Sequence, residues 1–350
     1  MLTAAVRDLN LAHPGRFAID VRTACDGLWA HNPHLTRLSD DDAEATQIHC
    51  DYPLIHHSND RPVHFIRGFI EDLGEKLGVS VTPTAFKGDI HLAPQEKLWI
   101  SQVQEITRTE VPFWIIVAGG KADYTIKWWD PARWQDVVDH FRGRILFVQV
   151  GEAQHIHSPL DGVLDFRGRT NLRQLVRLVY HAQGVVCPVT SLMHLAAAVE
   201  VKGGRPKNRP CVVVAGGREP AQWEAYPHHQ FIHTNGSLLC CDQGGCWKSR
   251  TVALGDADKK DQSLCVDVVD LGSGERKPGS AWGEHNDGGR GRYLPRCMEM
   301  ISSDEVIRRI ETYFRGGATR YLTASEVEIA ARAVAGDSRP AGRNADAGAT

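Results

Sequence analysis

Hydrophobic positions alternate along the chain between short apolar runs and stretches with helical spacing. Apolar runs typical of buried strands cover residues 113–117, 145–150, 163–166, 185–186 and 211–214. Segments of helical periodicity lie between them, at residues 131–141 and 171–182. This regular alternation predicts an α/β fold with a parallel, doubly wound sheet, in which ligands bind at the carboxyl ends of the strands.

The first hundred residues show a weaker form of the same pattern. Helical spacing marks residues 1–11, 62–78 and 94–106, and short apolar segments predict strands at residues 17–22, 47–52 and 89–92. We therefore predict two domains of similar architecture, one over residues 1–105 and one over residues 106–238.

The remainder of the chain divides by composition. Residues 239–300 are rich in cysteine and contain a glycine-rich, charged stretch at residues 272–292, which we expect to be a mobile loop. C-terminal helices are predicted over residues 301–335, where Ser302 and Glu305 form a capping box. The small and polar tail, residues 336–350, is expected to be disordered.

Composition excludes several classes of protein. The chain has 350 residues, 42% of them hydrophobic and 24% charged, which is typical of a globular protein of two domains. A formal net charge of -3 disfavours a nucleic-acid binder. No apolar run approaches the roughly 20 residues of a membrane span, and no signal peptide opens the chain. We therefore expect a cytoplasmic protein with at most peripheral membrane contact.

The stretch GVVCPVTSLMHLAAAV at residues 184–199 carries the strongest chemical signal. It predicts a strand, a tight turn and a helix that begins near Thr190 and Ser191. The start of a helix presents unpaired N–H groups and the positive end of its dipole, which suits a diphosphate. His194 lies one turn further on the same helical face and can point at the same ligand. The alternative is a buried turn whose histidine has a partner in the core.

Glycines follow several of the predicted strands. Gly119-Gly120, Gly151 and Gly216-Gly217 should gather at one edge of the sheet, together with Glu152. They indicate ligand contact only weakly, because glycines also simply terminate strands.

These motifs together resemble the ADP-heptose:lipopolysaccharide heptosyltransferases, glycosyltransferase family 9. The resemblance rests on AGGK after a strand, KWWDP at residues 127–131, Gly151-Glu152 and TSLMHL at residues 190–195, and it is strongest over residues 113–198. It implies two Rossmann-like domains that face each other across a cleft, the GT-B arrangement. It also implies an ADP-linked nucleotide sugar as donor.

The resemblance assigns roles to individual residues. Lys127 matches the family lysine that contacts the nucleotide diphosphate, and Glu152 matches the family's acidic residue. The family loop Asp-Thr-Gly-Leu-x-His matches residues 189–194, but Val189 and Ser191 replace its Asp and Gly, so a carboxylate contact is lost. The candidate ligand-binding residues are Lys127, Glu152, Thr190, Ser191, His194, Gly119 and Gly120.

The start of the chain departs further from the family. Family members open with a strand and a Gly-Asp loop, and that Asp is the proposed general base. Neither feature precedes the helix predicted at residues 1–11, so we expect an N-terminally truncated sequence whose base lies upstream of Met1. Asp20 and Asp26 carry no motif that makes either of them a substitute.

The activity that the resemblance implies is transfer of a heptose or related sugar to a hydroxyl group. The acceptor would be lipopolysaccharide, another glycan or a protein, and the reaction would be inverting and need no catalytic metal. The alternative is a protein that binds a sugar nucleotide without transferring the sugar, because the Gly-Asp loop is absent.

Five of the nine cysteines fall in a second cluster: Cys240, Cys241, Cys246, Cys265 and Cys297. Four thiolates from tight turns and distant segments make a tetrahedral site for a structural metal, with zinc the first choice and iron the second. Some heptosyltransferases that modify autotransporters resemble this chain in carrying a cysteine-held metal. The alternative is a set of free, buried thiols.

Overall fold

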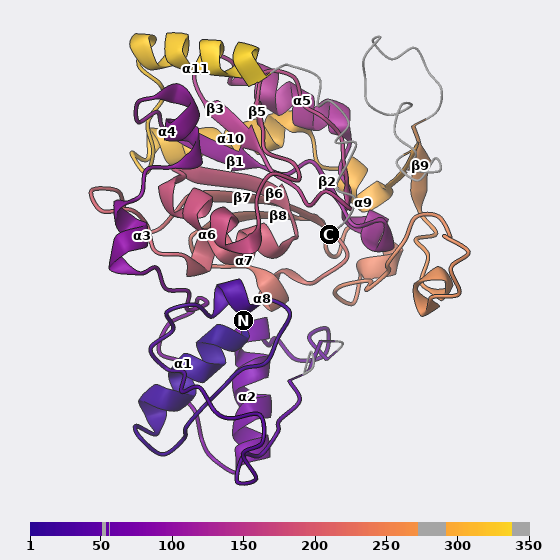
Figure 1. Ribbon diagram of the computed structural model, residues 1–350. Helices are drawn as coiled ribbons and strands as arrows, with labels where there is room; N and C mark the ends of the chain where they lie inside the picture. The colour runs from indigo at the N-terminus through magenta and orange to yellow at the C-terminus, as the bar shows by residue number, and fades with distance from the viewer. Residues whose placement is uncertain (51–53, 56, 272–291, 338–350) are drawn as a thin grey trace, which may run out of the picture.

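A six-stranded parallel sheet forms the centre of the protein (Figure 1). The computed structural model describes residues 1–50, 54–55, 57–271 and 292–337. The strands lie in the order β5-β3-β1-β6-β7-β8. Their bounds are Phe113–Ile116 for β1, Leu146–Gln149 for β3, Leu164–Asp165 for β5, Gly184–Pro188 for β6, Cys211–Gly216 for β7 and His229–His233 for β8. The predicted parallel sheet is confirmed; only β8 was not predicted.

Helices cover both faces of this sheet. α6 (Leu172–His181) and α7 (Ser191–Ala198) pack on one face, where Ile115 of β1 lies in their core. α5 (Pro131–His140) and α10 (Ser303–Arg315) pack on the other face, where the neighbouring Trp114 points. Successive side chains of a strand point to opposite faces, so a strand buried on both sides is continuously apolar, as the sequence of β1 is.

Side-chain caps fix where the predicted helices begin. The Asn171 side chain accepts a hydrogen bond from the backbone N–H of Gln174 at the start of α6, and the Gln174 side-chain oxygen accepts one from the backbone N–H of Asn171. Asp130 caps α5 by accepting from the backbone N–H of Ala132, and Ser302 caps α10 by accepting from that of Glu305, which forms one half of the predicted capping box. These caps satisfy N–H groups that have no partner inside the helix.

Shorter elements connect this framework. They are α3 (Pro94–Leu98), α4 (Gln102–Thr107), β2 (Gly119–Gly120), η2 (Ala122–Lys127), β4 (Ile156–His157), α8 (Ala221–Glu224), η3 (Leu239–Cys241), η4 (Lys259–Gln262), β9 (Val268–Asp270), β10 (Tyr293–Pro295), α9 (Arg296–Glu299) and α11 (Ala324–Asp337). β2 pairs with β4, and β9 pairs with β10, both antiparallel.

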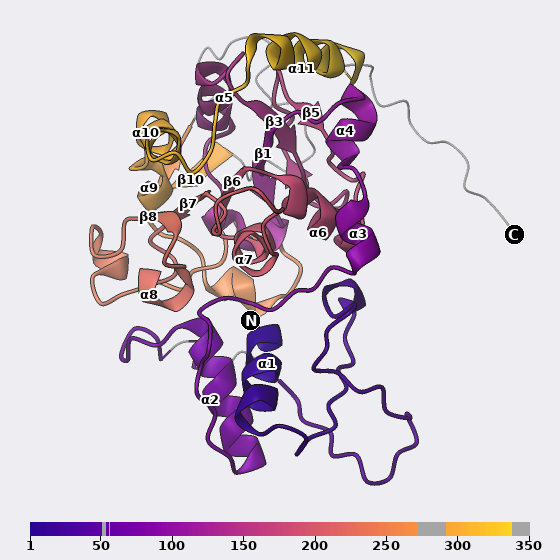
Figure 2. The same ribbon diagram turned by 90° about the vertical axis from the view of Figure 1, so that its left-hand side faces the viewer.

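The N-terminal region, residues 1–105, differs from its prediction. Two of the three predicted helices are present as α1 (Leu2–Ala12) and α2 (Phe65–Leu77), which lie side by side below the sheet in Figures 1 and 2. The helix predicted at residues 94–106 is interrupted and forms α3 and α4, and η1 (Asp26–Leu28) is a short additional turn. Among the described residues before β1, however, no strand forms, and the only β-type pairing is an isolated bridge between Ile90 and Val199. The strands predicted at residues 17–22, 47–50 and 89–92 are therefore wrong, and residues 51–52 lie outside the described part.

Local polar contacts explain part of this difference. The carboxylate of Asp20 accepts hydrogen bonds from the backbone N–H groups of Val21 and Leu38, at 2.8 and 3.1 Å. Short polar side chains that bond to nearby backbone offer it an alternative to a sheet ladder. The second Rossmann-like sheet expected of a GT-B protein is accordingly not formed by the described residues of the N-terminal region.

The N-terminal region nevertheless shares a core with the sheet domain. Phe65 at the start of α2 stacks on Trp223 of α8, with ring centroids 4.7 Å apart. Asn59 exchanges hydrogen bonds with the backbone of Gly245, at 2.8 and 2.9 Å. The predicted loop at residues 272–292 and the predicted disordered tail fall almost entirely outside the described residues. Within the described part of the chain, no helix has both the length and the apolar character that a membrane crossing requires.

Candidate functional site at the carboxyl edge of the sheet

The helix start predicted at Thr190 and Ser191 is confirmed. Thr190 has extended backbone, and its side-chain oxygen accepts a hydrogen bond from the N–H of Leu192 at 3.2 Å. Ser191, the first residue of α7, is exposed. The helix directly follows β6, so its N-terminus lies at the carboxyl edge of the sheet and presents a positive dipole end there.

His194 lies one turn into α7 and has an internal partner. Its Nδ1 lies 3.0 Å from the hydroxyl of Tyr226. Burial lowers the pKa of His194 well below its usual value, and the charge of Lys127 acts in the same direction. The imidazole is therefore neutral at physiological pH, and one of its nitrogens is already engaged.

Lys127 ends η2 and reaches the same part of the edge. Its Nζ lies 2.8 Å from Oε1 of Glu219, and its side chain is 21% exposed. Burial lowers the pKa of Lys127 to about 8, while the carboxylate of Glu224 opposes this shift. Lys127 thus stands beside carboxylates and close enough to His194 to act on it electrostatically.

Three charged residues of this site follow β7 and were not predicted: Arg218, Glu219 and Glu224. The guanidinium of Arg218 donates to Glu219 and also to the carbonyl of Lys248, the latter at 2.7 Å. Burial raises the pKa of Glu224, against the pull of the two neighbouring cations. The signal that could have found these residues is the REP sequence after the second AGG, because that glycine pair also ends a strand at the carboxyl edge.

The remaining predicted site residues have other contacts. Glu152 is 63% exposed and lies 3.1 Å from His155. Gly119 pairs with His157 across β2 and β4, and a Cβ on Gly119 would lie 2.1 Å from the Ile156 carbonyl oxygen. The close approach of the β4 backbone therefore explains why position 119 is a glycine, and Gly120 belongs to the same strand pair. Their predicted contact with a ligand stays a prediction.

The predicted metal cluster is not assembled in the structure. Cys241 and Cys297 approach the Gly217 turn, and electrostatic effects link Cys297 to Cys240, Cys246 and Cys265. Within the described residues, which include all five of these cysteines, no group of three or more His, Cys, Asp or Glu side chains could hold a metal ion. Burial instead raises the pKa of the Cys297 thiol to about 12, so this thiol is protonated as it stands.

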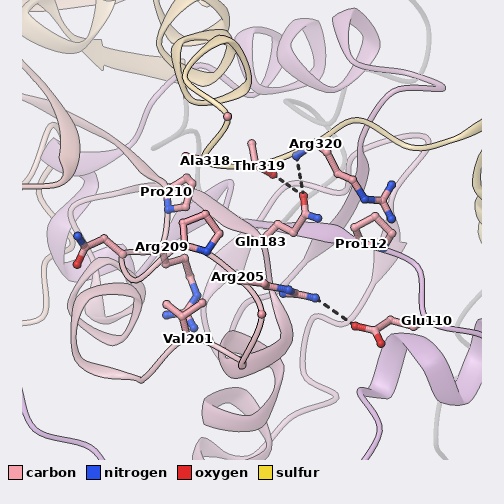
Figure 3. Close-up of a pocket in the computed structure, with 14 residues that line it drawn as sticks. Glu110, Pro112, Gln183, Val201, Arg205, Arg209, Pro210, Ala318, Thr319 and Arg320 are labelled. Carbon is pink, nitrogen blue, oxygen red and sulfur yellow. Dashed lines mark hydrogen bonds and ion pairs between the residues drawn. The ribbon is translucent and has the colours of Figure 1, made fainter.

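Cavities occur elsewhere in the molecule. A cavity of about 350 Å³ lies at the opposite, amino edge of the sheet, beside Pro112, Gln183 and Pro210, which directly precede β1, β6 and β7 (Figure 3). A second cavity, of about 690 Å³, lies in the N-terminal region and is lined by Asp20, Arg22, Asp26, Trp29 and Asn32, among others.

Residues 89–235 match the model of Glycosyltransferase family 9 (heptosyltransferase). No curated protein matches the chain. Among solved structures, a family 9 glycosyl transferase from Veillonella parvula is 17% identical with a TM-score of 0.44, over 73% of this chain and 61% of that one.

Two heptosyltransferases from E. coli are similar at the same level. TibC, solved in complex with ADP-D-beta-D-heptose, is 17% identical with a TM-score of 0.44, over 74% of this chain and 54% of TibC. ADP-heptose lps heptosyltransferase II is 13% identical with a TM-score of 0.42, over 73% of this chain and 63% of that one. The chain thus spans 54–63% of the length of these three proteins. The resemblance predicted from the sequence is confirmed by the family match: residues 89–235 match the model of glycosyltransferase family 9, the heptosyltransferase family.

Proposed function

We propose that the protein is a glycosyltransferase that binds an ADP-sugar at the carboxyl edge of the sheet and transfers a heptose or related sugar to a hydroxyl group. The observation that carries this proposal is the family 9 match over residues 89–235, because that segment contains β1 to β8, Lys127 and α7. An open helix N-terminus and a partly buried lysine that acts electrostatically on the same helix also support it, since this combination suits a diphosphate.

In this proposal the diphosphate is both the group by which the protein binds the donor and the leaving group of the reaction. The bond between the sugar C1 and the diphosphate oxygen breaks, a bond from C1 to the acceptor oxygen forms, and the acceptor's proton passes to a base. Lys127, Arg218 and the N-terminus of α7 stabilise the negative charge that develops on the diphosphate. We propose a single inverting displacement without a catalytic metal, because these positive groups can stabilise the leaving group themselves.

We propose a glycan as acceptor, whether part of lipopolysaccharide, another saccharide or a glycosylated protein. The cavity in the N-terminal region supports this, because Trp29 lines it together with Asp26 and Asn32. The side chain of Asn32 is buried, and its Nδ2 has no hydrogen-bond partner among the described residues. An aromatic ring with carboxylate and amide groups offers both the apolar face and the polar partners that a sugar uses.

Nucleotide binding is the first test. ADP should raise the melting temperature of the protein, and Lys127→Ala should weaken this shift, with UDP and GDP measured alongside to identify the base. A folded protein that shows no shift at saturating ADP would contradict the proposed donor site. Incubation with ADP-heptose and acceptor glycans then separates a transferase from a protein that only binds the sugar nucleotide.

We also propose a structural metal, zinc or iron, held by four of Cys240, Cys241, Cys246, Cys265 and Cys297. The mutual electrostatic effects among these thiols support it. As they stand the thiols do not form the site, so metal binding requires their side chains to turn toward each other and lose their protons. Purified protein should then contain about one equivalent of metal, and Cys246→Ser should release it. Metal-free protein with unchanged stability in that variant would contradict this.

A further inference from the structure

Two buried carboxylates follow β7 at the carboxyl edge, and each has an oxygen without a partner. Glu219 is 3% exposed and Glu224 is 5% exposed. Neither Oε2 atom makes a hydrogen bond with any described residue. A buried polar atom without a hydrogen bond is costly, so two of them in neighbouring side chains need an explanation.

The need to neutralise nearby cations explains why Glu219 is buried, but it does not explain why Glu224 is buried. Lys127 and Arg218 both contact Glu219, the lysine through Oε1. Glu224 is attracted by the same two cations at longer range, yet burial still raises its pKa. A carboxyl group that only balanced charge would be expected to form a direct ion pair, as Glu219 does.

The ligand group that suits such a carboxylate is a hydroxyl. A phosphate oxygen carries negative charge and is repelled by Glu224, whereas a sugar O–H donates a hydrogen bond. Lys127, Arg218 and the N-terminus of α7 are the positive side of the same site. The edge is thus divided into a part that suits a diphosphate and a part that suits a hydroxyl-rich sugar.

The loop after β6 cannot supply this carboxylate itself. Its first residue is Val189, which is apolar and buried. The loop after β7 is its neighbour, because β6 and β7 pair in parallel with Pro188 opposite Val214. A glutamate that follows β7 can therefore reach the same ligand from the adjacent strand end.

We infer that Glu224 binds hydroxyl groups of the sugar carried by the nucleotide donor, and that Glu219 holds Lys127 until the diphosphate takes its place. This inference rests on the proposed function and names the residue that recognises the sugar. It makes Glu224 a specificity-determining residue, because a ligand without a suitably placed hydroxyl leaves its carboxylate unsatisfied.

Access to Glu224 requires movement of the N-terminal region. α8 is covered by α2, where Phe65 stacks on Trp223 next to Glu224. The main chain of Glu224 also contacts the imidazole of His64, at the start of α2. A sugar therefore reaches Glu224 only when α2 and α8 separate.

The experiment compares two ligands that differ only in the sugar. Dissociation constants for ADP and ADP-heptose are measured by calorimetry on the wild-type protein, on Glu224→Gln, on Glu224→Leu and on Glu328→Gln, an exposed glutamate of α11. We expect Glu224→Leu to weaken ADP-heptose binding about 10- to 100-fold relative to ADP binding, because charge-assisted hydrogen bonds to the sugar are lost. The dissociation constant of Glu224→Gln for ADP-heptose should lie between those of the wild type and Glu224→Leu, and that of Glu328→Gln should match the wild type.

Thermal melting of the free proteins gives a second readout. Glu224→Leu removes a buried, unsatisfied carboxyl group, so it should leave the melting temperature unchanged or raise it. A large drop in melting temperature with unchanged preference for ADP-heptose over ADP would show a structural role and overturn the inference. Equal losses for both ligands in the folded Glu224→Gln protein would also overturn it. A wild-type protein that binds neither ligand would instead contradict the proposed function.

Discussion

Both edges of the sheet carry cations that are largely shielded from solvent, but these cations contact different groups. At the amino edge, Arg209 is 3% exposed and donates to four backbone carbonyls, those of Ala182, Ala196, Val199 and Glu200. At the carboxyl edge, Lys127 contacts Glu219, and one oxygen each of Glu219 and Glu224 has no hydrogen-bond partner in the described part of the chain. Arg209 thus supplies hydrogen bonds to the carbonyl groups at the end of α7, whereas the carboxylates at the carboxyl edge have oxygens that could still accept hydrogen bonds.

Whether the buried polar atoms around a cation all have hydrogen-bond partners distinguishes a structural site from a candidate ligand site better than the size of the nearby cavity does. The cavity of about 350 Å³ lies at the amino edge, where Arg205 is paired with Glu110, and Gln183 bonds to Thr319 and Arg320 (Figure 3). None of the described residues that line this cavity has a buried side-chain nitrogen or oxygen without a hydrogen-bond partner, although His181 and His229, also near the amino edge, each have one such ring nitrogen. At the carboxyl edge the atoms without a partner are carboxylate oxygens of Glu219 and Glu224, which lie beside cations. Free hydrogen-bonding capacity is what a polar ligand would use.

Loss of Arg209 should have the largest effect on stability. Arg209→Leu leaves the carbonyls at the end of α7 without donors, so the free energy of unfolding should fall by about 3–5 kcal/mol, measured by urea denaturation. Arg320→Gln, a change to an exposed arginine paired with Glu326, is the matched control and should cost less than about 1 kcal/mol. Equal effects of the two substitutions would contradict the structural role of Arg209.

Loss of Lys127 should act on nucleotide binding in particular. Lys127→Ala removes a cation that acts electrostatically on α7, and ADP affinity should fall about 30-fold, roughly 2 kcal/mol, by calorimetry. Lys259→Ala, at an exposed lysine of η4, provides the control. If both variants bind ADP like the wild type, the carboxyl edge is not the diphosphate site. The comparison of the two edges would then no longer identify a ligand site.

The sequence predicts the carboxyl edge better than it predicts the N-terminal region, for a physical reason. The cap at Thr190 and the strand before it depend on residues a few positions apart, so local spacing is enough to find them. A strand needs a partner, and residues 17–22 lack one because Asp20 bonds to the backbone of Val21 and Leu38. Such contacts cannot be seen in hydrophobic periodicity.

The candidate site is predictable only where its residues belong to short sequence motifs. Lys127, Thr190 and His194 were found from motifs, and the structure places Lys127 and His194 within electrostatic reach of each other. Glu219 and Glu224 were missed because their significance lies in burial and in absent partners, which are properties of the packed molecule. Only their position after a strand and a glycine pair was visible in the sequence.

The lowered pKa of Lys127 predicts a pH dependence. Diphosphate binding needs the ammonium form, and burial lowers the pKa of Lys127 to about 8, so ADP affinity should be about tenfold weaker at pH 9 than at pH 7. Lys127→Arg keeps its charge and should bind ADP with little change over this range. The group has the opposite effect on folding: its pKa in the unfolded chain is near 10.5, so its contribution to stability increases as pH rises above about 8. A wild-type affinity that does not change between pH 7 and pH 9 would contradict the role of Lys127.

The smallest effect is expected at Thr190, where two roles can be separated. Thr190→Val keeps the shape of the side chain but removes the cap on the Leu192 N–H, so the free energy of unfolding should fall by about 1 kcal/mol. The same change removes a hydroxyl beside the proposed diphosphate, and ADP affinity should fall a few-fold, about 1 kcal/mol. Thr190→Ser retains the hydroxyl and should restore both quantities in denaturation and calorimetry. If Thr190→Val lowers stability but leaves ADP affinity unchanged, the start of α7 serves the fold alone, as the capped end of α7 does at Arg209.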